Sequence, residues 1–163
     1  MTTKRFEIER FSVTSSKSFE VVVTTLEEAV GHPDMVEFTT ATRDSRTFDE
    51  LETTVHQALG KTELMVFMKL DNGAILRKET GLNEPRIIRF LIGNPLIMKE
   101  MAKHVPDAAS YAPVTILIDE RSDGVHLSYD RMTSLLAPYG NSNALNIARN
   151  LDAKIEKLLQ DCC

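Results

Sequence analysis

The chain has 163 residues, of which 42% are hydrophobic and 26% are charged, and its formal net charge is −5. This composition excludes a disordered or low-complexity protein, and the length suits one domain with a sizeable core, which we expect to span residues 1–163. The longest apolar runs, such as LMVFM at Leu64–Met68, are far shorter than the ~20 residues of a membrane span. We therefore expect no membrane partner.

The charge, the aromatic content and the cysteines limit the partners and the cellular location that we expect. Trp is absent, aromatic residues make up 6% of the chain, and no cluster of Lys and Arg stands out, so we expect no nucleic-acid partner. The N-terminal MTTKRFEIERF lacks the apolar core of a secretory signal, and the two cysteines, Cys162 and Cys163, are adjacent and cannot crosslink a fold. Both features favour a cytoplasmic location. We expect the two cysteines to lie in a frayed tail.

The N-terminal third reads as one strand followed by helices. Alternation in RFEIERFSV predicts a strand with an irregularity near Arg10. Apolar side chains at helical spacing in FEVVVTTLEEAVG predict a helix, with Ser16 or Ser18 near its cap and Gly31 after its end. The helix outweighs the strand propensity of its valines because burying a continuous apolar stripe stabilises more than those propensities cost.

Two further helices are predicted before the central strands. Pro33 suits the first turn of a short helix. Thr47 and Glu50 have the spacing of a capping box, in which the carboxylate returns to the backbone NH of Thr47, and the helix behind them ends at Gly60.

The C-terminal half predicts strands and a long closing helix. Leu64–Leu70 and Arg86–Ile92 are strand candidates with a short helix or turn between them. PVTILIDE and GVHLSYD form a hairpin, in which Val114, Ile116 and Ile118 share a face with Val125, Leu127 and Tyr129 only if the numbers of paired residues sum to an odd value. A helix over Ala144–Leu159, behind a cap region at 141–143, is expected to lie across the sheet. This order of elements predicts an α+β fold.

Three C-terminal motifs carry a family resemblance. IGNP at Ile92–Pro95, APVTILIDE at Ala112–Glu120 and GVHLSYD at Gly124–Asp130 resemble the domain of unknown function 302 family. The resemblance extends over roughly Phe6–Leu159, with distinctive residues from Leu64 onward. It implies a curved antiparallel sheet that grips a long C-terminal helix, as in the TATA-binding-protein fold, and a homodimer. The family name assigns no biochemistry.

The chain departs from the family pattern in two ways. Some members carry a Cys before the Asn-Pro pair and another before the hairpin, where this chain has Gly93 and Ala112, so thiol or metal chemistry is not carried over. The helical stretch Pro33–Gly60 is also longer than the compact pattern and supplies additional N-terminal helices.

The polar face of the hairpin holds the candidate ligand-binding residues. Alternation places Asp119, His126, Ser128 and Asp130 on the face opposite the aliphatic residues, with Arg89 on the neighbouring strand. His126 with Asp119 and Ser128 would suit hydrolase-like or acid/base chemistry, and this is our alternative to binding. We favour the simpler interpretation, a face that contacts solvent or a second subunit.

Asn94 completes the candidate ligand-binding set. In the GNP turn Gly93 frees the backbone, Asn94 closes an Asx-type turn and Pro95 begins a helix, so we favour a structural joint. The alternative is an anion held by the amides of that helix N-terminus.

The sequence predicts a function class but no reaction. The four histidines, His32, His56, His104 and His126, lie on separate predicted elements without paired ligand spacings, so we expect no metal and no cofactor. The leading hypothesis is a cytoplasmic homodimeric binding module of unknown biochemical function that holds a small ligand or a protein partner against the sheet. An enzyme and a purely structural assembly protein are the alternatives.

Overall fold

A computed structural model describes Met1 and residues 3–163. The elements of this part of the chain are β1 (Arg10–Ser15), α1 (Phe19–Ala29), α2 (Met35–Asp44), α3 (Phe48–Ala58), β2 (Met65–Asp71), α4 (Gly73–Thr80), β3 (Ile87–Gly93), α5 (Pro95–Ala102), the 3-10 turn η1 (Pro106–Ser110), β4 (Val114–Arg121), β5 (Gly124–Asp130), α6 (Met132–Leu136), η2 (Ala137–Tyr139) and α7 (Ser142–Cys162). The expected α+β class is confirmed.

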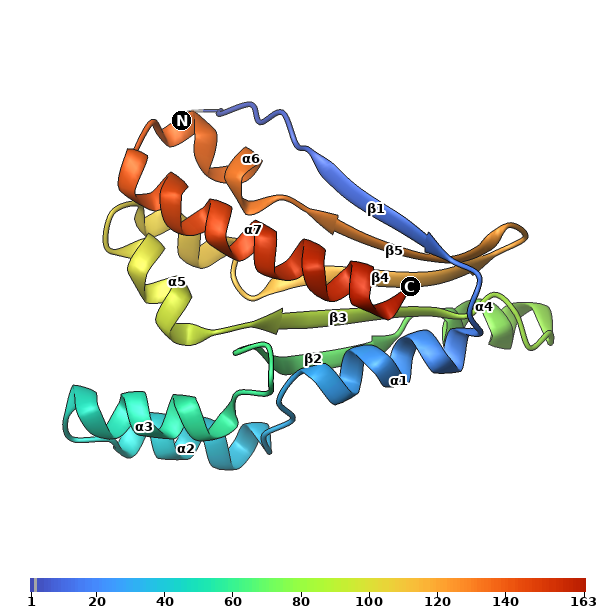
Figure 1. Cartoon of the computed structure of the whole chain (residues 1–163), viewed down its shortest axis with the longest axis horizontal. Helices are drawn as coiled ribbons and strands as arrows, with labels where there is room; N and C mark the ends of the chain where they lie inside the picture. Colours follow the sequence, from blue (N-terminus) through green and yellow to red (C-terminus); the bar gives the residue numbers. More distant parts are fainter. Residues whose placement is uncertain (2) are drawn as a thin grey trace.

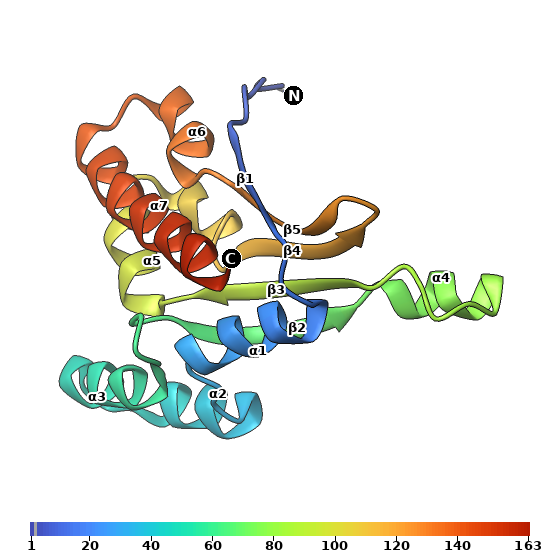
Figure 2. The ribbon, with the colours of Figure 1, turned by 45° about the vertical axis from the view of Figure 1, so that its right-hand side comes forward.

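All strand pairs of the curved five-stranded sheet are antiparallel, in the order β1-β5-β4-β3-β2. The long helix α7 lies across one face of this sheet, with α1 beside it on the same side (Figures 1 and 2). The α2–α3 pair lies below the β2 edge (Figure 1). The expected sheet that grips a long C-terminal helix is therefore present.

The register of the β4–β5 hairpin sets the two faces of the sheet. Ile118 pairs with Leu127, and Asp119 pairs with His126, so the paired numbers sum to an odd value as predicted. Val114, Ile116 and Ile118 of β4 and Val125 and Leu127 of β5 are buried on the α7 side, and Ile118 and Leu127 have no exposed surface. His126 and Asp119 point to the opposite face, because successive side chains of a strand alternate.

The predicted helices α1 and α7 are confirmed with their caps. Ser18 accepts a hydrogen bond from the backbone NH of Val21, and Val22 and Leu26 are fully buried. Asn141 caps α7 by accepting from the backbone NH of Ala144. The valine-rich segment is helical because its apolar stripe has a sheet face to pack against.

Two expected boundaries and one expected capping contact were wrong. The first strand begins at Arg10 and not near residue 6, because its partner β5 ends at Asp130. Helix α2 begins at Met35 with Asp34 as its cap, and Pro33 lies before it. The Glu50 carboxylate returns to the backbone NH of Arg46 rather than Thr47, although Thr47 caps α3 as predicted.

The expected frayed cysteine tail was also wrong. Helix α7 continues to Cys162, which is fully buried, and burial raises the pKa of its thiol to about 11. Cys163 donates from Sγ to the carbonyl of Leu159. Lys17 holds the same end of the helix by donating to the carbonyl of Cys162, so the last turn is packed against the segment between β1 and α1.

Helix α4 projects from the body at the end of the β2–β3 pair (Figures 1 and 2). Its Ile75 is 75% exposed, and Leu82, just beyond the helix, is 65% exposed. Arg77 holds the base of this arm by donating to Asp71 and to the carbonyl of Pro85. No helix in the described part of the chain has the length and apolar character needed to cross a bilayer.

We expect Leu127→Ala to lower the free energy of unfolding by about 2–5 kcal/mol, because it removes a fully buried side chain from the layer under α7. Leu82→Ala is the matched control and should change stability by less than about 0.5 kcal/mol. Urea unfolding followed by circular dichroism measures both. Equal effects of the two substitutions would contradict the assigned faces.

Candidate functional site

The face of the sheet opposite α7 carries the candidate site. It is built from alternate side chains of β3, β4 and β5, whose other side chains form the core. Phe90 is fully buried among the core residues, so the residue before it, Arg89, must project to the other side. The same alternation brings Thr115 of β4 and Ser128 of β5 to this face.

Two cavities adjoin on this face. The first has a volume of about 390 Å³ and the second about 230 Å³. Arg89, Thr115 and Asp130 line both cavities, so these residues mark the place where the two hollows meet. The first extends to Tyr111 of the η1 region and to Leu135 of α6. Segments that are distant in sequence thus enclose the end of the sheet face.

Arg89 lies at the junction of the two cavities with incomplete hydrogen bonding. Its Nη2 donates to Oγ1 of Thr115 at 3.1 Å. Its Nε is buried and has no acceptor among the residues that the structure describes. A half-buried guanidinium with unused donors is suited to bind an anionic group, because its planar fork of N–H donors matches a carboxylate.

The carboxylate at the same junction is already neutralised. Arg10 donates to both oxygens of Asp130, at 2.6 Å and 2.9 Å, and this contact raises the pKa of Arg10. The charged residues lining the two cavities are Arg10, Arg89 and Asp130. Because Arg10 and Asp130 form a pair, the charge of Arg89 remains uncompensated within the lining, and the junction is positive.

His126 and Asp119 belong to a separate cluster near the hairpin turn. The Nε2 atom of His126 lies 2.8 Å from Oδ1 of Asp123, and its Nδ1 lies 3.4 Å from the hydroxyl of Thr14. The hydrogen bond to His126 lowers the pKa of Asp123. Asp119 is held by the guanidinium of Arg121.

The candidate acid/base set is therefore not connected. Among the described residues, no hydrogen bond joins His126 to Asp119 or to Ser128, although Asp119 and His126 are cross-strand neighbours. Ser128 lines the second cavity, away from the histidine cluster. A nucleophile and its base need hydrogen-bond contact, and this arrangement lacks it.

Asn94 lies outside both cavities and is committed to the backbone. Its Oδ1 accepts from the NH of Leu96 at 2.8 Å, and its Nδ2 donates to the carbonyl of Glu63 at 3.0 Å. Pro95 is the first residue of α5. The geometry is that of the expected structural joint.

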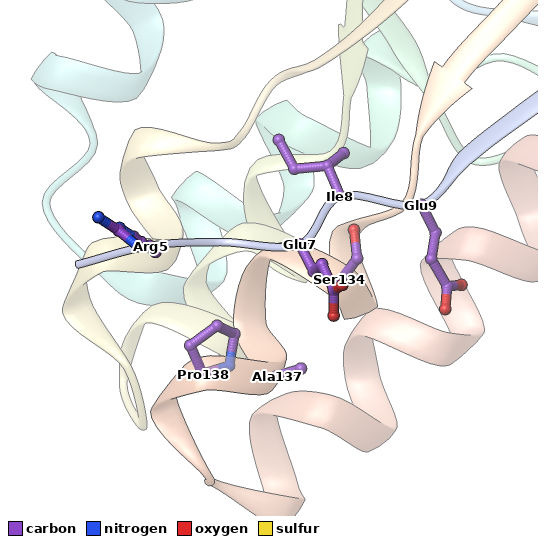
Figure 3. A pocket seen from close by; sticks show the side chains of 7 residues that line it. All are labelled: Arg5, Glu7, Ile8, Glu9, Ser134, Ala137 and Pro138. Atoms are coloured by element: carbon purple, nitrogen blue, oxygen red, sulfur yellow. The ribbon is translucent and has the colours of Figure 1, made fainter.

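A larger hollow, with a volume of about 700 Å³, lies elsewhere, between the N-terminal segment and the α6–η2 region. Figure 3 shows Glu7 directed toward Ser134 and Ile8 directed to the other side of the segment. Glu9 is paired with Arg131, and Ile8 is 53% exposed. The hollow borders an exposed extended segment, its Glu9 is already paired and its Ile8 faces largely into solvent, so we do not assign a site to it.

Sequence reasoning missed three residues that shape the candidate site: Arg10, Thr115 and Tyr111. Thr115 could have been found, because the alternation that predicts Ile116 as buried also places Thr115 beside Arg89. Arg10 was noted only as the position of an irregularity in the predicted first strand. Its contact with Asp130 depends on the pairing of β1 with β5. Tyr111 follows η1, a turn that no pattern in the sequence indicates, and its hydroxyl lies 3.0 Å from that of Tyr139.

A buried carboxylate in α7 was missed as well. Asp152 is 6% exposed and accepts from the hydroxyl of Tyr129 at 2.7 Å and from the backbone NH of Met132 at 2.8 Å. Both the NH and the hydroxyl of Thr133 also donate to it. Burial and the nearby Asp152 charge raise the pKa of Tyr129. One side chain thus joins β5, the start of α6 and α7.

No group of three or more His, Cys, Asp or Glu side chains in the described residues is placed to hold a metal ion.

The chain matches the family model for the domain of unknown function DUF302 over residues 38–162. This match begins further toward the N-terminus than the distinctive motifs and includes α3.

A crystal structure of an uncharacterised conserved DUF302 protein from Bacillus stearothermophilus is similar to this chain, with a TM-score of 0.66 at 13% sequence identity. The similarity covers 94% of this chain and 98% of that chain, and at this identity it concerns the fold alone. None of the curated proteins compared with the chain matches it.

We expect Asp152→Ala to destabilise the fold by about 3 kcal/mol or more, because it removes the acceptor of the buried Tyr129 hydroxyl and of Thr133, and leaves the NH of Met132 with the Tyr129 oxygen alone. Asp161→Ala is the matched control on the same helix. Asp161 is 60% exposed and pairs with Lys157, so its loss should cost less than about 0.5 kcal/mol. Denaturant unfolding compares the two, and a small effect of Asp152→Ala would contradict the joining role.

Proposed function

Because the chain belongs to the DUF302 family, whose description assigns no activity, we propose a function from its site: a module that binds a small molecule on the sheet face opposite α7. The observation that supports this proposal is the pair of adjoining cavities at Arg89, Thr115 and Asp130. Their volumes are in or near the range of small-molecule sites, and polar groups meet at their junction.

Binding is favoured over catalysis by the separation of the candidate groups. Of the six residues predicted as ligand-binding, Arg89, Ser128 and Asp130 line the cavities, whereas His126 and Asp119 are engaged by Asp123 and Arg121. Strands of the sheet carry Arg89, Thr115, Ser128 and Asp130, which suits a preorganised binding surface. The proposed setting is the cytoplasm, where the free thiols of Cys162 and Cys163 would stay reduced.

A homodimer is part of the proposal. Two features support it: the resemblance to a family with homodimeric members, and the exposed apolar side chains Ile75, Leu76 and Leu82 on the projecting α4 arm. A second copy is the proposed partner of this arm, since clustered exposed apolar side chains are typical of contact sites.

The ligand-binding proposal is tested by NMR chemical-shift mapping of the labelled chain with a mixed library of small organic fragments. We expect shifts at the amides of Arg89, Thr115 and Ser128. Thr115→Tyr should weaken this binding at least tenfold, because the larger side chain occupies the junction of the cavities. Thr14→Tyr is the control, as Thr14 is exposed on the same face but lines neither cavity. A library that perturbs none of the cavity residues would refute the proposal.

The dimer proposal is tested by native mass spectrometry and light scattering of the intact chain. We expect the mass of two chains, and the mass of one chain for Ile75→Asp, since a charge in the apolar contact opposes association. Val36→Asp is the control, because Val36 is 77% exposed on α2 and lies apart from the arm. A monomeric wild-type chain, or a dimer unaffected by Ile75→Asp, would overturn this part of the proposal.

A further inference from the structure

The charges and walls of the two cavities indicate the class of ligand. We propose that they bind a small monocarboxylate with an apolar chain, with its carboxylate on Arg89. This inference rests on the proposed function and adds the chemistry of the ligand to it. Three independent features support it: the unused donors of Arg89, the charge balance of the lining, and the apolar wall of the larger cavity.

The first feature is the hydrogen bonding of Arg89. Among the described residues its side chain makes one hydrogen bond, from Nη2 to Thr115, and its Nε has no acceptor. A guanidinium has five N–H donors in a planar fork, and bidentate pairing with a carboxylate uses two of them at once. Thr115, which lines both cavities, holds the guanidinium at their junction, so the donors are positioned before a ligand arrives.

The second feature is the charge balance. The Arg10–Asp130 pair contributes no net charge, and Arg89 leaves the lining with one positive charge. A partly desolvated cation is stabilised by one opposite charge. The lining offers one uncompensated positive charge, so a monoanion suits this site better than a phosphate dianion.

The third feature is the wall that faces the larger cavity. Its apolar side chains are those of Leu91, Ala112, Pro113 and Leu135, whereas Val114 contributes backbone because its side chain faces the core. An aliphatic chain placed against this wall would leave water, which stabilises by about 25 cal/mol for each Å² of apolar surface removed from water. A carboxylate at Arg89 and an aliphatic tail toward Leu135 therefore use both parts of the site.

The arrangement also separates this site from Arg121, a further arginine on the same face. Arg121 is bound to Asp119 at the hairpin turn, its side chain is 55% exposed, and it lines neither cavity. An anion at Arg121 would have to compete with Asp119 and with water. Arg121 thus provides a control that carries the same charge on the same face without the cavity.

The test is an NMR titration of the full chain with three probes of equal length: hexanoate, hexanamide and hexylamine. We expect hexanoate to shift the amides around Arg89 and Thr115, hexanamide to bind at least tenfold more weakly, and hexylamine not to bind. Inorganic phosphate should bind more weakly than hexanoate. The affinity for hexanoate should fall as salt rises, because the contact with Arg89 is an ion pair.

Two substitutions locate the contact. Arg89→Gln should weaken hexanoate binding at least tenfold and leave the binding of hexanamide unchanged, and Arg121→Gln should leave both unchanged. If Arg89→Gln does not fold, as judged by its amide spectrum, the comparison of hexanoate with hexanamide on the unaltered chain decides the question.

The outcomes separate this inference from the function on which it rests. Equal binding of hexanoate and hexanamide at the cavities, or full binding by Arg89→Gln, would overturn the carboxylate class while the binding module stands. Tighter binding of phosphate than of hexanoate would also overturn the carboxylate class alone. The same holds if none of the three probes binds while other fragments bind at the cavities. If no probe and no fragment shifts the cavity amides, both the carboxylate class and the binding module are overturned.

Discussion

The alternation of side chains along β3, β4 and β5 is the constraint on which the rest of this molecule depends. Each strand must present one set of side chains to α7 and the other set to the opposite face, because the pleat has a period of two. Phe90, Ile116 and Leu127 thereby enter the core with no exposed surface. Arg89 and Thr115 must then share the outer face. The core and the candidate site are two consequences of one register.

Asp152 ties the helical layer to this sheet at the point where the site is built. Tyr129 points into the core and donates to Asp152, while the next residue, Asp130, points outward and accepts from Arg10. The same Asp152 holds the start of α6, whose Leu135 reaches the larger cavity. The buried Asp152 carboxylate, with its four donors, therefore stabilises the core and also holds in place α6, which lines the cavity on the far face of the sheet.

Much of the fold was predictable because local patterns and tertiary packing agree. The parity of the β4–β5 register followed from two aliphatic sets that had to share one face, and the structure has it. The valine-rich α1 was recognised by its stripe, and Asn94 by its place before a helix-starting proline. The predicted secondary structure was wrong where a neighbouring element determines it. At Glu9 the predicted strand does not form, because the paired strand β5 has already ended. At Cys162 the end of α7 is packed rather than frayed.

The sequence by itself determined which face of each strand is apolar, where the main helices lie, and that Arg89, Ser128, Asp119, Asp130 and His126 share the polar side. Periodicity contains this information because it depends only on the geometry of one element at a time. The tertiary structure alone decided that Arg89 binds Thr115 and lines the same cavity as Asp130, whereas His126 contacts Asp123 and Thr14. Those partners lie on different strands and turns, so their contacts depend on how the elements pack, which no single periodic pattern records.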